Sequence, residues 1–262
     1  MSEKMHKILI LPDIHGREFW KEPCGNPEEY DKIVFLGDYL DPYPEEGIDR
    51  EETIKNFRQI IKFKKKNLDK VVLLIGNHDE AYINSMMPKS RYDYKNSGKI
   101  GKLFDDNKKL FSLAYEEEIN GKRYIFSHSG IEMPWIDDFK EMYEWEQPND
   151  DNFVDFLNNN FLTSSDSSAS ILYMVSRYRG GWDSVGSCIW GDLQEFYNYA
   201  FSTTKRHLPN SYQIFGHTYI KEPLVMESFA CLDCCKAFIL EDGVVKGLNG
   251  EIIPVRGQFG SK

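Results

Sequence analysis

The chain has 262 residues, of which 41% are hydrophobic, and this is enough to bury one large α/β core. No apolar run reaches the roughly 18 residues of a membrane-spanning helix, so no membrane association is expected. The formal net charge of -10 argues against binding nucleic acid through a broad basic surface. The five cysteines are odd in number and follow no regular framework, which fits a reducing compartment and predicts a cytoplasmic location.

The first two apolar runs of the chain both end in carboxylates. Residues 7–12 (KILILP) lead to Asp13 and His15, and residues 32–37 (KIVFLG) lead to Asp38 and Asp41. Short apolar runs without alternation are typical of strands buried on both faces of a parallel sheet. The carboxyl edge of such a sheet is where ligand-binding groups usually lie.

A helix is predicted over residues 49–68. Asp49 can cap its N-terminus, and apolar residues recur on one face: Ile54, Phe57, Ile60, Ile61 and Leu68. Residues 70–80 (KVVLLIGNHDE) then repeat the earlier pattern, because a strand ends at Gly76 and is followed by Asn77 and His78. Residues 32–76 therefore read as a parallel strand–helix–strand crossover.

The next part of the chain is predicted to leave the sheet and return as a hairpin. Residues 84–113 are polar and read as an insertion with a helix near 103–113. Strands at 113–119 and 123–127 are joined by Asn120 and Gly121, the strongest two-residue hairpin signal, and His128 follows the second strand.

Residues 134–206 are rich in aromatics, with helical patterns at 153–161, 169–175 and 193–200, and predict a mostly helical cap. The irregular stretch 177–183 (RYRGGWD) is either a structural turn or a place where Arg177 or Arg179 contacts a phosphoryl oxygen. Residues 212–216 form another strand, which leads to His217. The tail 224–248 reads as strands with a turn at 241–243, forming an antiparallel ribbon of a second sheet.

Polar residues at strand ends have two interpretations. A single Asp or His in this position is more often a cap or a hydrogen-bonded structural residue. Here five strands end this way, and four of the six histidines lie at such ends: His15, His78, His128 and His217. Burying several carboxylates and imidazoles together without a cation is strongly unfavourable, so the pattern indicates a bound metal or a charged substrate.

Five motifs together resemble the calcineurin-like metallophosphoesterases: Asp13-x-His15, Gly37-Asp38-Tyr39-Leu40-Asp41, Gly76-Asn77-His78-Asp79, Ser127-His128 and Gly216-His217-Thr218. Within that superfamily the chain is most similar to the branch of phosphoprotein phosphatases and diadenosine tetraphosphatases, on residues 37–41, 126–131, 190–192 and 231–235. The resemblance implies an α/β fold, a two-sheet sandwich flanked by helices. It implies one domain over residues 1–262, with the cap-like insertion at about 134–206.

The resemblance also implies a binuclear metal site. Asp13 and His15 would bind the first ion and Asp38 would bridge both, while the second ion would be bound by Asn77, His128 and His217. Manganese is the expected metal, with iron or zinc as alternatives, because imidazole-rich sites disfavour calcium. A hydroxide between the two ions would attack phosphorus.

His78 would protonate the leaving oxygen, with Asp41 close enough to orient it and keep it cationic; the alternative is a purely structural histidine. The protein phosphatases continue their second motif as Asp-Arg-Gly, and that arginine contacts the substrate phosphate. Here Pro42 follows Asp41. The phosphate contact is therefore absent or comes from elsewhere, with Arg177 and Arg179 as candidates and Arg17 as a weaker one.

The expected activity is hydrolysis of a phosphomonoester, as in a Ser/Thr phosphatase, on a small molecule, nucleotide or phosphoprotein. The alternatives are a dinucleoside polyphosphate hydrolase and a non-catalytic module that binds a phosphorylated partner. Cys231, Cys234 and Cys235 are interpreted as strand packing rather than a zinc knuckle, because no matching ligand pair follows.

Overall fold

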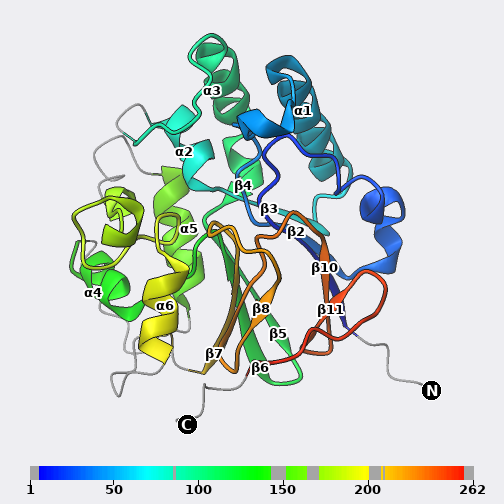
Figure 1. Ribbon diagram of the computed structural model, residues 1–262, viewed down its shortest axis with the longest axis vertical. Helices are drawn as coiled ribbons and strands as arrows, with labels where there is room; N and C mark the ends of the chain where they lie inside the picture. The colour runs from blue at the N-terminus through cyan, green and yellow to red at the C-terminus, as the bar shows by residue number, and fades with distance from the viewer. Residues whose placement is uncertain are drawn as a thin grey trace. The chain divides into compact units, whose positions relative to one another are not determined.

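The chain forms two mixed β-sheets, each with helices beside it (Figure 1). The computed structural model describes residues 6–84, 87–142, 152–163, 171–200, 208 and 210–256. Its contacts divide the chain into a first unit, Met1–Ser112 with Cys235–Ile253, and a second unit, Leu113–Cys234 with Pro254–Lys262. The α/β class with two sheets flanked by helices is confirmed, whereas the single-domain organisation stays a prediction.

The first unit holds a six-stranded sheet of order β11-β10-β1-β2-β3-β4. The strands are β1 (Lys7–Leu11), β2 (Lys32–Phe35), β3 (Val71–Leu74), β4 (Phe111–Ser112), β10 (Phe238–Glu241) and β11 (Val244–Gly247). Strands β1 to β4 are parallel, whereas β10 and β11 are antiparallel to their neighbours. The helices are α1 (Arg50–Lys66), α2 (Asn77–Ile83) and α3 (Ser97–Asp105).

Helix α1 confirms the predicted cap. The Asp49 carboxylate accepts hydrogen bonds from the backbone N–H groups of Glu51 and Glu52, at 2.8 and 3.2 Å. Phe57 lies on the buried face, and its ring centroid is 4.8 Å from that of Phe104 in α3. Leu68, predicted for the same face, lies beyond the last helical residue and is 56% exposed, so that prediction was wrong.

Helix α3 spans Ser97–Asp105, so it overlaps the predicted helix at 103–113 only at its end, and most of that predicted range was wrong. Its buried residues are Ile100 and Phe104, one helical turn apart. Phe104 also contacts Phe111 in β4, with ring centroids 5.3 Å apart. The packing of Ile100 and Phe104 therefore sets the position of α3. The other residues of this segment are mostly polar and show no clear helical pattern.

The second unit holds a five-stranded sheet of order β5-β6-β7-β9-β8. The strands are β5 (Ala114–Ile119), β6 (Lys122–Ser127), β7 (Ser211–Phe215), β8 (Leu224–Val225) and β9 (Phe229–Cys231), and the helices are α4 (Met133–Met142), α5 (Phe153–Thr163) and α6 (Leu193–Ala200). The predicted hairpin is confirmed, because Asn120 and Gly121 between β5 and β6 have φ values of 53° and 73°. Positive φ at both central residues is what a two-residue hairpin turn requires.

The tail of the chain corrects one prediction. The ribbon β10–β11, with its turn at Asp242, belongs to the first unit's sheet and not to the second, although β8 and β9 do form an antiparallel pair in the second. Ile10 in β1 pairs with Phe238 in β10. Strand β1 is buried along Ile8–Leu11 and has β2 on one edge only, so β10 satisfies the backbone groups of its other edge.

The region predicted as a cap contains α4, α5 and α6. Helices α5 and α6 confirm the patterns at 153–161 and 193–200. The predicted helix at 169–175 begins outside the described residues, and its described part is a short 3-10 turn at 171–173. Whether the region covers a substrate stays a prediction. Within the described part of the chain, no helix is both long and apolar enough to cross a membrane.

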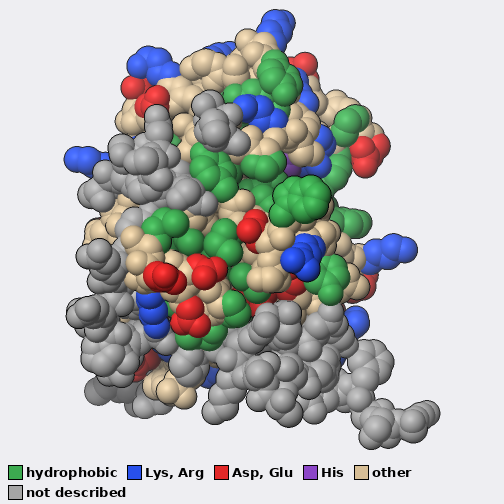
Figure 2. Space-filling view, turned by 90° about the vertical axis from the view of Figure 1, so that its left-hand side faces the viewer, with side chains coloured by type: hydrophobic (Ala, Val, Ile, Leu, Met, Phe, Trp, Pro, Cys, Tyr) green, Lys and Arg blue, Asp and Glu red, His purple; other side chains and the backbone are tan. Residues whose placement is uncertain are grey.

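The surface shown in Figure 2 carries charges of both signs. Basic side chains (blue) are scattered among acidic (red) and hydrophobic (green) ones, and the described residues form no continuous basic field on this face. A dispersed pattern of this kind differs from the basic stripe that usually binds nucleic acid.

Candidate metal centre

Three neighbouring strands of the first unit deliver polar side chains to one edge of their sheet. Parallel strands β1, β2 and β3 lead to His15, Asp38 with Asp41, and His78, respectively. His15, Asp38 and Asp41 have φ values of 43°, 53° and 56°, a region that residues other than glycine rarely adopt. Such backbone conformations concentrate at functional sites, where the surrounding structure must maintain them.

Two glycines allow these loops to approach each other. A Cβ atom on Gly37 would lie 2.5 Å from the backbone nitrogen of Gly76, and one on Gly76 would lie 2.1 Å from Oδ1 of Asp38. Neither distance is compatible with a side chain. The glycines therefore place the loop after β2 directly against the start of α2.

His15 is oriented as a metal-binding imidazole. Its Nδ1 donates to the carbonyl oxygen of Leu40 at 2.7 Å, which leaves the lone pair on Nε2, and Nε2 lies 3.5 Å from Oδ2 of Asp38. Burial lowers the pKa of His15 to about 3, with the neighbouring Asp38 carboxylate opposing that change. The ring is therefore neutral near pH 7, as metal binding requires.

The structure brings His15, Asp38 and His78 together. One ligand atom from each lies within 4.8 Å of the others, and all three side chains are buried. Asp13 and Asn77, the other predicted ligands in this unit, are 1% and 4% exposed; Asp13 lies in the loop after β1, and Asn77 is the first residue of α2. Imidazole nitrogen with carboxylate oxygen is a donor set that suits manganese, iron or zinc, so the residues present fit such an ion.

His78 and Asp41 form the predicted pair. The Nδ1 atom of His78 lies 2.9 Å from Oδ2 of Asp41. The other Asp41 oxygen, Oδ1, accepts from the hydroxyl of Tyr82 at 2.5 Å and from Nη1 of Arg50 at 3.1 Å. With both oxygens occupied, Asp41 fixes the orientation of the His78 ring and directs its Nε2 away from the carboxylate.

Asp79, the last residue of the third motif, is a structural residue of this site for which the sequence predicted no role. It is fully buried, and its carboxylate accepts from the backbone N–H groups of Gly76, Asp38 and Tyr39 at 2.9, 2.7 and 3.0 Å. Burial and the nearby Asp38 carboxylate raise the pKa of Asp79, and the three donors oppose this. The signal was its place in the first turn of α2, where carboxylates commonly cap.

The second unit contributes a histidine pair. His128 follows β6 and His217 follows β7, and these two strands are parallel neighbours. The Nε2 atom of His128 lies 3.1 Å from Nδ1 of His217, and His217 has a φ of 66°. The Trp190 ring packs edge-on to His217, with centroids 5.9 Å apart.

These strand-end clusters agree with the comparison to known families. The family model described as calcineurin-like phosphoesterase matches residues 6–220. The protein belongs to this family. It is a metallophosphoesterase with candidate metal-binding histidine and aspartate residues.

Three solved structures are similar to this phosphoesterase. A protein serine/threonine phosphatase from Saccharomyces cerevisiae is 15% identical, with 91% of this chain and 74% of the other covered and a TM-score of 0.49. A conserved protein from Streptococcus pneumoniae TIGR4, described as a predicted phosphoesterase, is 10% identical, with 97% and 95% covered and a TM-score of 0.33. A hypothetical protein from Pyrococcus horikoshii OT3 is 15% identical, with 48% and 56% covered and a TM-score of 0.30.

At these TM-scores the structural matches support no inference about activity, and the family assignment depends on the family model. A search of curated proteins finds no significant relative.

The two arginines predicted to bind substrate differ in position. In the phosphoesterase, Nε of Arg179 lies 2.7 Å from Oδ2 of Asp192, and its Nη2 donates to the carbonyl oxygen of His217 and to the Thr218 hydroxyl at 3.2 and 2.5 Å. Arg177 is exposed, and its Nε donates to the carbonyl oxygen of Trp182 at 3.3 Å. Arg179 belongs to a 3-10 turn at Arg177–Arg179, and its side chain reaches the residues that follow β7. Substrate binding by either arginine stays a prediction.

Arg91 lies at the site of the first unit, where the sequence analysis had no reason to place it. Its Nη2 is 3.4 Å from Nε2 of His15 and 3.3 Å from Nε2 of His78. No local pattern predicts this position, because Arg91 belongs to the polar insertion and follows no strand. Cys231, in contrast, packs in β9 with Sγ 3.7 Å from the carbonyl oxygen of Gly216, which favours the packing interpretation of this thiol.

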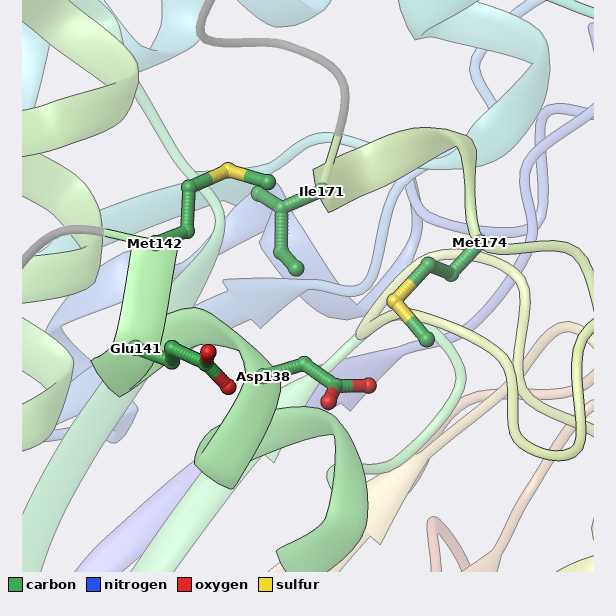
Figure 3. Close-up of a pocket in the computed structure, with 5 residues that line it drawn as sticks. All are labelled: Asp138, Glu141, Met142, Ile171 and Met174. Carbon is green, nitrogen blue, oxygen red and sulfur yellow. The ribbon is translucent and has the colours of Figure 1, made fainter.

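A separate cavity of about 410 Å³ lies in the second unit, lined by Asp138, Glu141, Met142, Ile171 and Met174. Figure 3 shows the carboxylates of Asp138 and Glu141 on one side and the Met174 side chain on the other. Burial raises the pKa of Asp138. The five described lining residues include two carboxylates, no Lys or Arg and none of the predicted site residues.

Proposed function

We propose that the protein hydrolyses phosphomonoesters with two divalent metal ions and with His78 as the general acid. The observation behind the proposal is the pair of His78 and Asp41, 2.9 Å apart, beside the buried ligand atoms of His15 and Asp38. A general acid needs an oriented proton-bearing atom within reach of the leaving group. Because Nδ1 of His78 faces Asp41, Nε2 is the atom that gives the proton.

Six residues of the chain would hold the ions. We propose that Asp13, His15, Asp38 and Asn77, with His128 and His217, bind one pair of ions, supported by a family match that runs through all six positions. Such ions polarise phosphoryl oxygens and make a water molecule nucleophilic near neutral pH. Manganese is proposed because the donors combine carboxylate, amide and imidazole, with iron or zinc as alternatives.

The proposed substrate is a phosphomonoester of a small molecule, a nucleotide or a phosphoprotein, in line with the resemblance of the motifs to the phosphoprotein phosphatase branch. A dinucleoside polyphosphate is the second candidate. It is favoured by Trp182, whose side chain is 92% exposed next to Arg177, since an open aromatic ring can stack on a base. We further propose a cytoplasmic location.

Hydrolysis assays test this proposal. The manganese-loaded protein is assayed on p-nitrophenyl phosphate, on p-nitrophenyl phenylphosphonate and on diadenosine tetraphosphate, as wild type and as His78→Asn. His6→Asn is the matched control, because His6 is a histidine outside the site. We expect His78→Asn to lower kcat on the preferred substrate by about 10²- to 10⁴-fold at unchanged metal content, and His6→Asn to have no effect.

The substrate profile decides between the candidates. Preference for the monoester supports the main proposal, and cleavage confined to the dinucleotide supports the second. Full metal occupancy without turnover of any of the three compounds would contradict both and indicate a binding module.

A further inference from the structure

Arg91 lies between two imidazoles that the proposed reaction uses. Its Nη2 is 3.3 Å from Nε2 of His78 and 3.4 Å from Nε2 of His15. Arg91 is half-buried, so its guanidinium lies beside these rings and is still partly open to solvent. A guanidinium in this position can bind an anionic group of a ligand through Nη2.

The guanidinium of Arg91 is held in place from several directions. Its Nε donates to the carbonyl oxygen of Asp41 at 2.9 Å, and the guanidinium carbon Cζ lies 3.8 Å from the ring centroid of Tyr43. The backbone carbonyl of Arg91 accepts from Nη2 of Arg50 at 2.7 Å, and the residue has a φ of 54°. Because these contacts restrict the side chain, little further conformational entropy is lost when the guanidinium binds a ligand.

The neighbouring arginines are committed to other partners. Arg17 pairs with Glu46 at 2.8 Å, and Arg50 contacts the Asp41 carboxylate and the Arg91 carbonyl. Among the cations of the described residues around His78, Arg91 has a guanidinium nitrogen, Nη2, 3.3 Å from Nε2 of His78.

The proposed role of His78 as general acid indicates which anionic group binds Arg91. A leaving oxygen within hydrogen-bond reach of His78 Nε2 is also within a few ångströms of Arg91 Nη2, since the two nitrogens are 3.3 Å apart. The phosphoryl oxygens attached to the same phosphorus then face the guanidinium. We propose that Arg91 binds these non-bridging phosphoryl oxygens of the substrate, in place of the arginine that is absent after Asp41; this inference rests on the proposed function.

The binding mode also predicts a substrate preference. A guanidinium interacts more strongly with the dianionic phosphoryl group of a monoester than with the monoanionic group of a diester. Arg91 therefore favours monoesters, and its removal affects them more.

The test compares manganese-loaded wild type with Arg91→Ala and Arg91→Lys. The control is Lys89→Ala, which removes a cation of the same segment that lies over Tyr92 at 5.4 Å. Binding of inorganic phosphate is measured by calorimetry, and kcat/KM is measured for the monoester and the phosphonate. Metal content and the thermal midpoint are recorded for each variant.

We expect the dissociation constant for phosphate to rise about 10- to 100-fold in Arg91→Ala, which corresponds to the loss of a charge-assisted hydrogen bond. Arg91→Lys should recover part of the affinity, because it keeps the charge and loses the planar fork. Added guanidinium ions should partly restore Arg91→Ala, and Lys89→Ala should match the wild type. The ratio of monoester to phosphonate kcat/KM should fall in Arg91→Ala. If Arg91→Ala does not fold, the role of Arg91 is tested with Arg91→Lys alone, which should bind phosphate more weakly than the wild type.

The outcomes separate this inference from the proposed function. Unchanged phosphate binding in the Arg91 variants, with wild-type turnover intact, overturns the role of Arg91 alone. Phosphate binding that depends on Arg91, in a protein that cleaves no phosphoester, supports the role of Arg91 and refutes the proposed function. A metal-loaded wild type that binds no phosphate refutes both.

Discussion

Replacing Glu80 with glutamine should stabilise the protein at alkaline pH. Glu80 lies in α2, is 2% exposed, and its Oε2 has no hydrogen-bond partner among the described residues. Burial raises the pKa of this carboxyl from 4.5 to about 8, although Lys108 acts in the opposite direction. Between these two pH values the folded protein binds more protons than the unfolded chain, so the contribution of Glu80 to stability falls as the pH rises.

The magnitude follows from the two pKa values. The pKa of Glu80 is 4.5 in the unfolded chain and about 8 in the folded protein. By linkage, ionisation of Glu80 lowers the free energy of unfolding by less than about 1 kcal/mol at pH 5 and by at most about 5 kcal/mol at pH 8.5. Glutamine has a similar shape and does not ionise. The gain in unfolding free energy of Glu80→Gln over wild type should therefore grow by about 2 to 4 kcal/mol between these two pH values.

Urea unfolding of the metal-free protein measures this difference. Wild type and Glu80→Gln are unfolded at pH 5.0 and pH 8.5 in the presence of a chelator, with Glu45→Gln as a control on an exposed carboxylate of the same unit. A difference between Glu80→Gln and wild type that does not change with pH would refute the reasoning. So would an equal pH dependence in Glu45→Gln.

Two further substitutions test the packing of the first unit. Gly76→Ala would place a Cβ atom 2.1 Å from Oδ1 of Asp38 and should weaken manganese binding by at least about tenfold in a calorimetric titration, whereas Gly25→Ala, in open space, should not. Phe57→Ala should lower the unfolding free energy by about 3 to 5 kcal/mol in urea, because the ring is fully buried. A loss below about 1 kcal/mol would show that the core relaxes around the gap.

The proximity of the His15, Asp38 and His78 side chains could be predicted, because it depends on a local sequence pattern and one general rule. Each residue follows a short apolar run, and parallel strands place their carboxyl ends at one edge. The prediction needed only the three apolar runs and this rule, and it did not require the strand register. The structure accordingly places ligand atoms of these residues within 4.8 Å of one another.

Features that depend on long-range packing could not be predicted in this way. The ribbon β10–β11 has a clear local turn, but nothing in its sequence distinguishes the free edge of β1 from the edge of another sheet. The start of α3 depends on where Phe104 meets Phe57. Arg91 reaches its position through contacts with Tyr43 and the Asp41 carbonyl, which are 48 and 50 residues away along the chain, so no periodicity reveals it.

The carboxylate of Asp79 has a consequence for the thermodynamics of metal loading. By accepting the N–H groups of Gly76, Asp38 and Tyr39, it joins the loop after β2 to the first turn of α2 without any ion. The conformational entropy of these segments is therefore lost when the chain folds and not when a metal binds. Ion affinity at this edge then reflects mainly ligand desolvation and coordination, and the backbone amides of residues 38, 39 and 76 remain protected from solvent exchange in the metal-free protein.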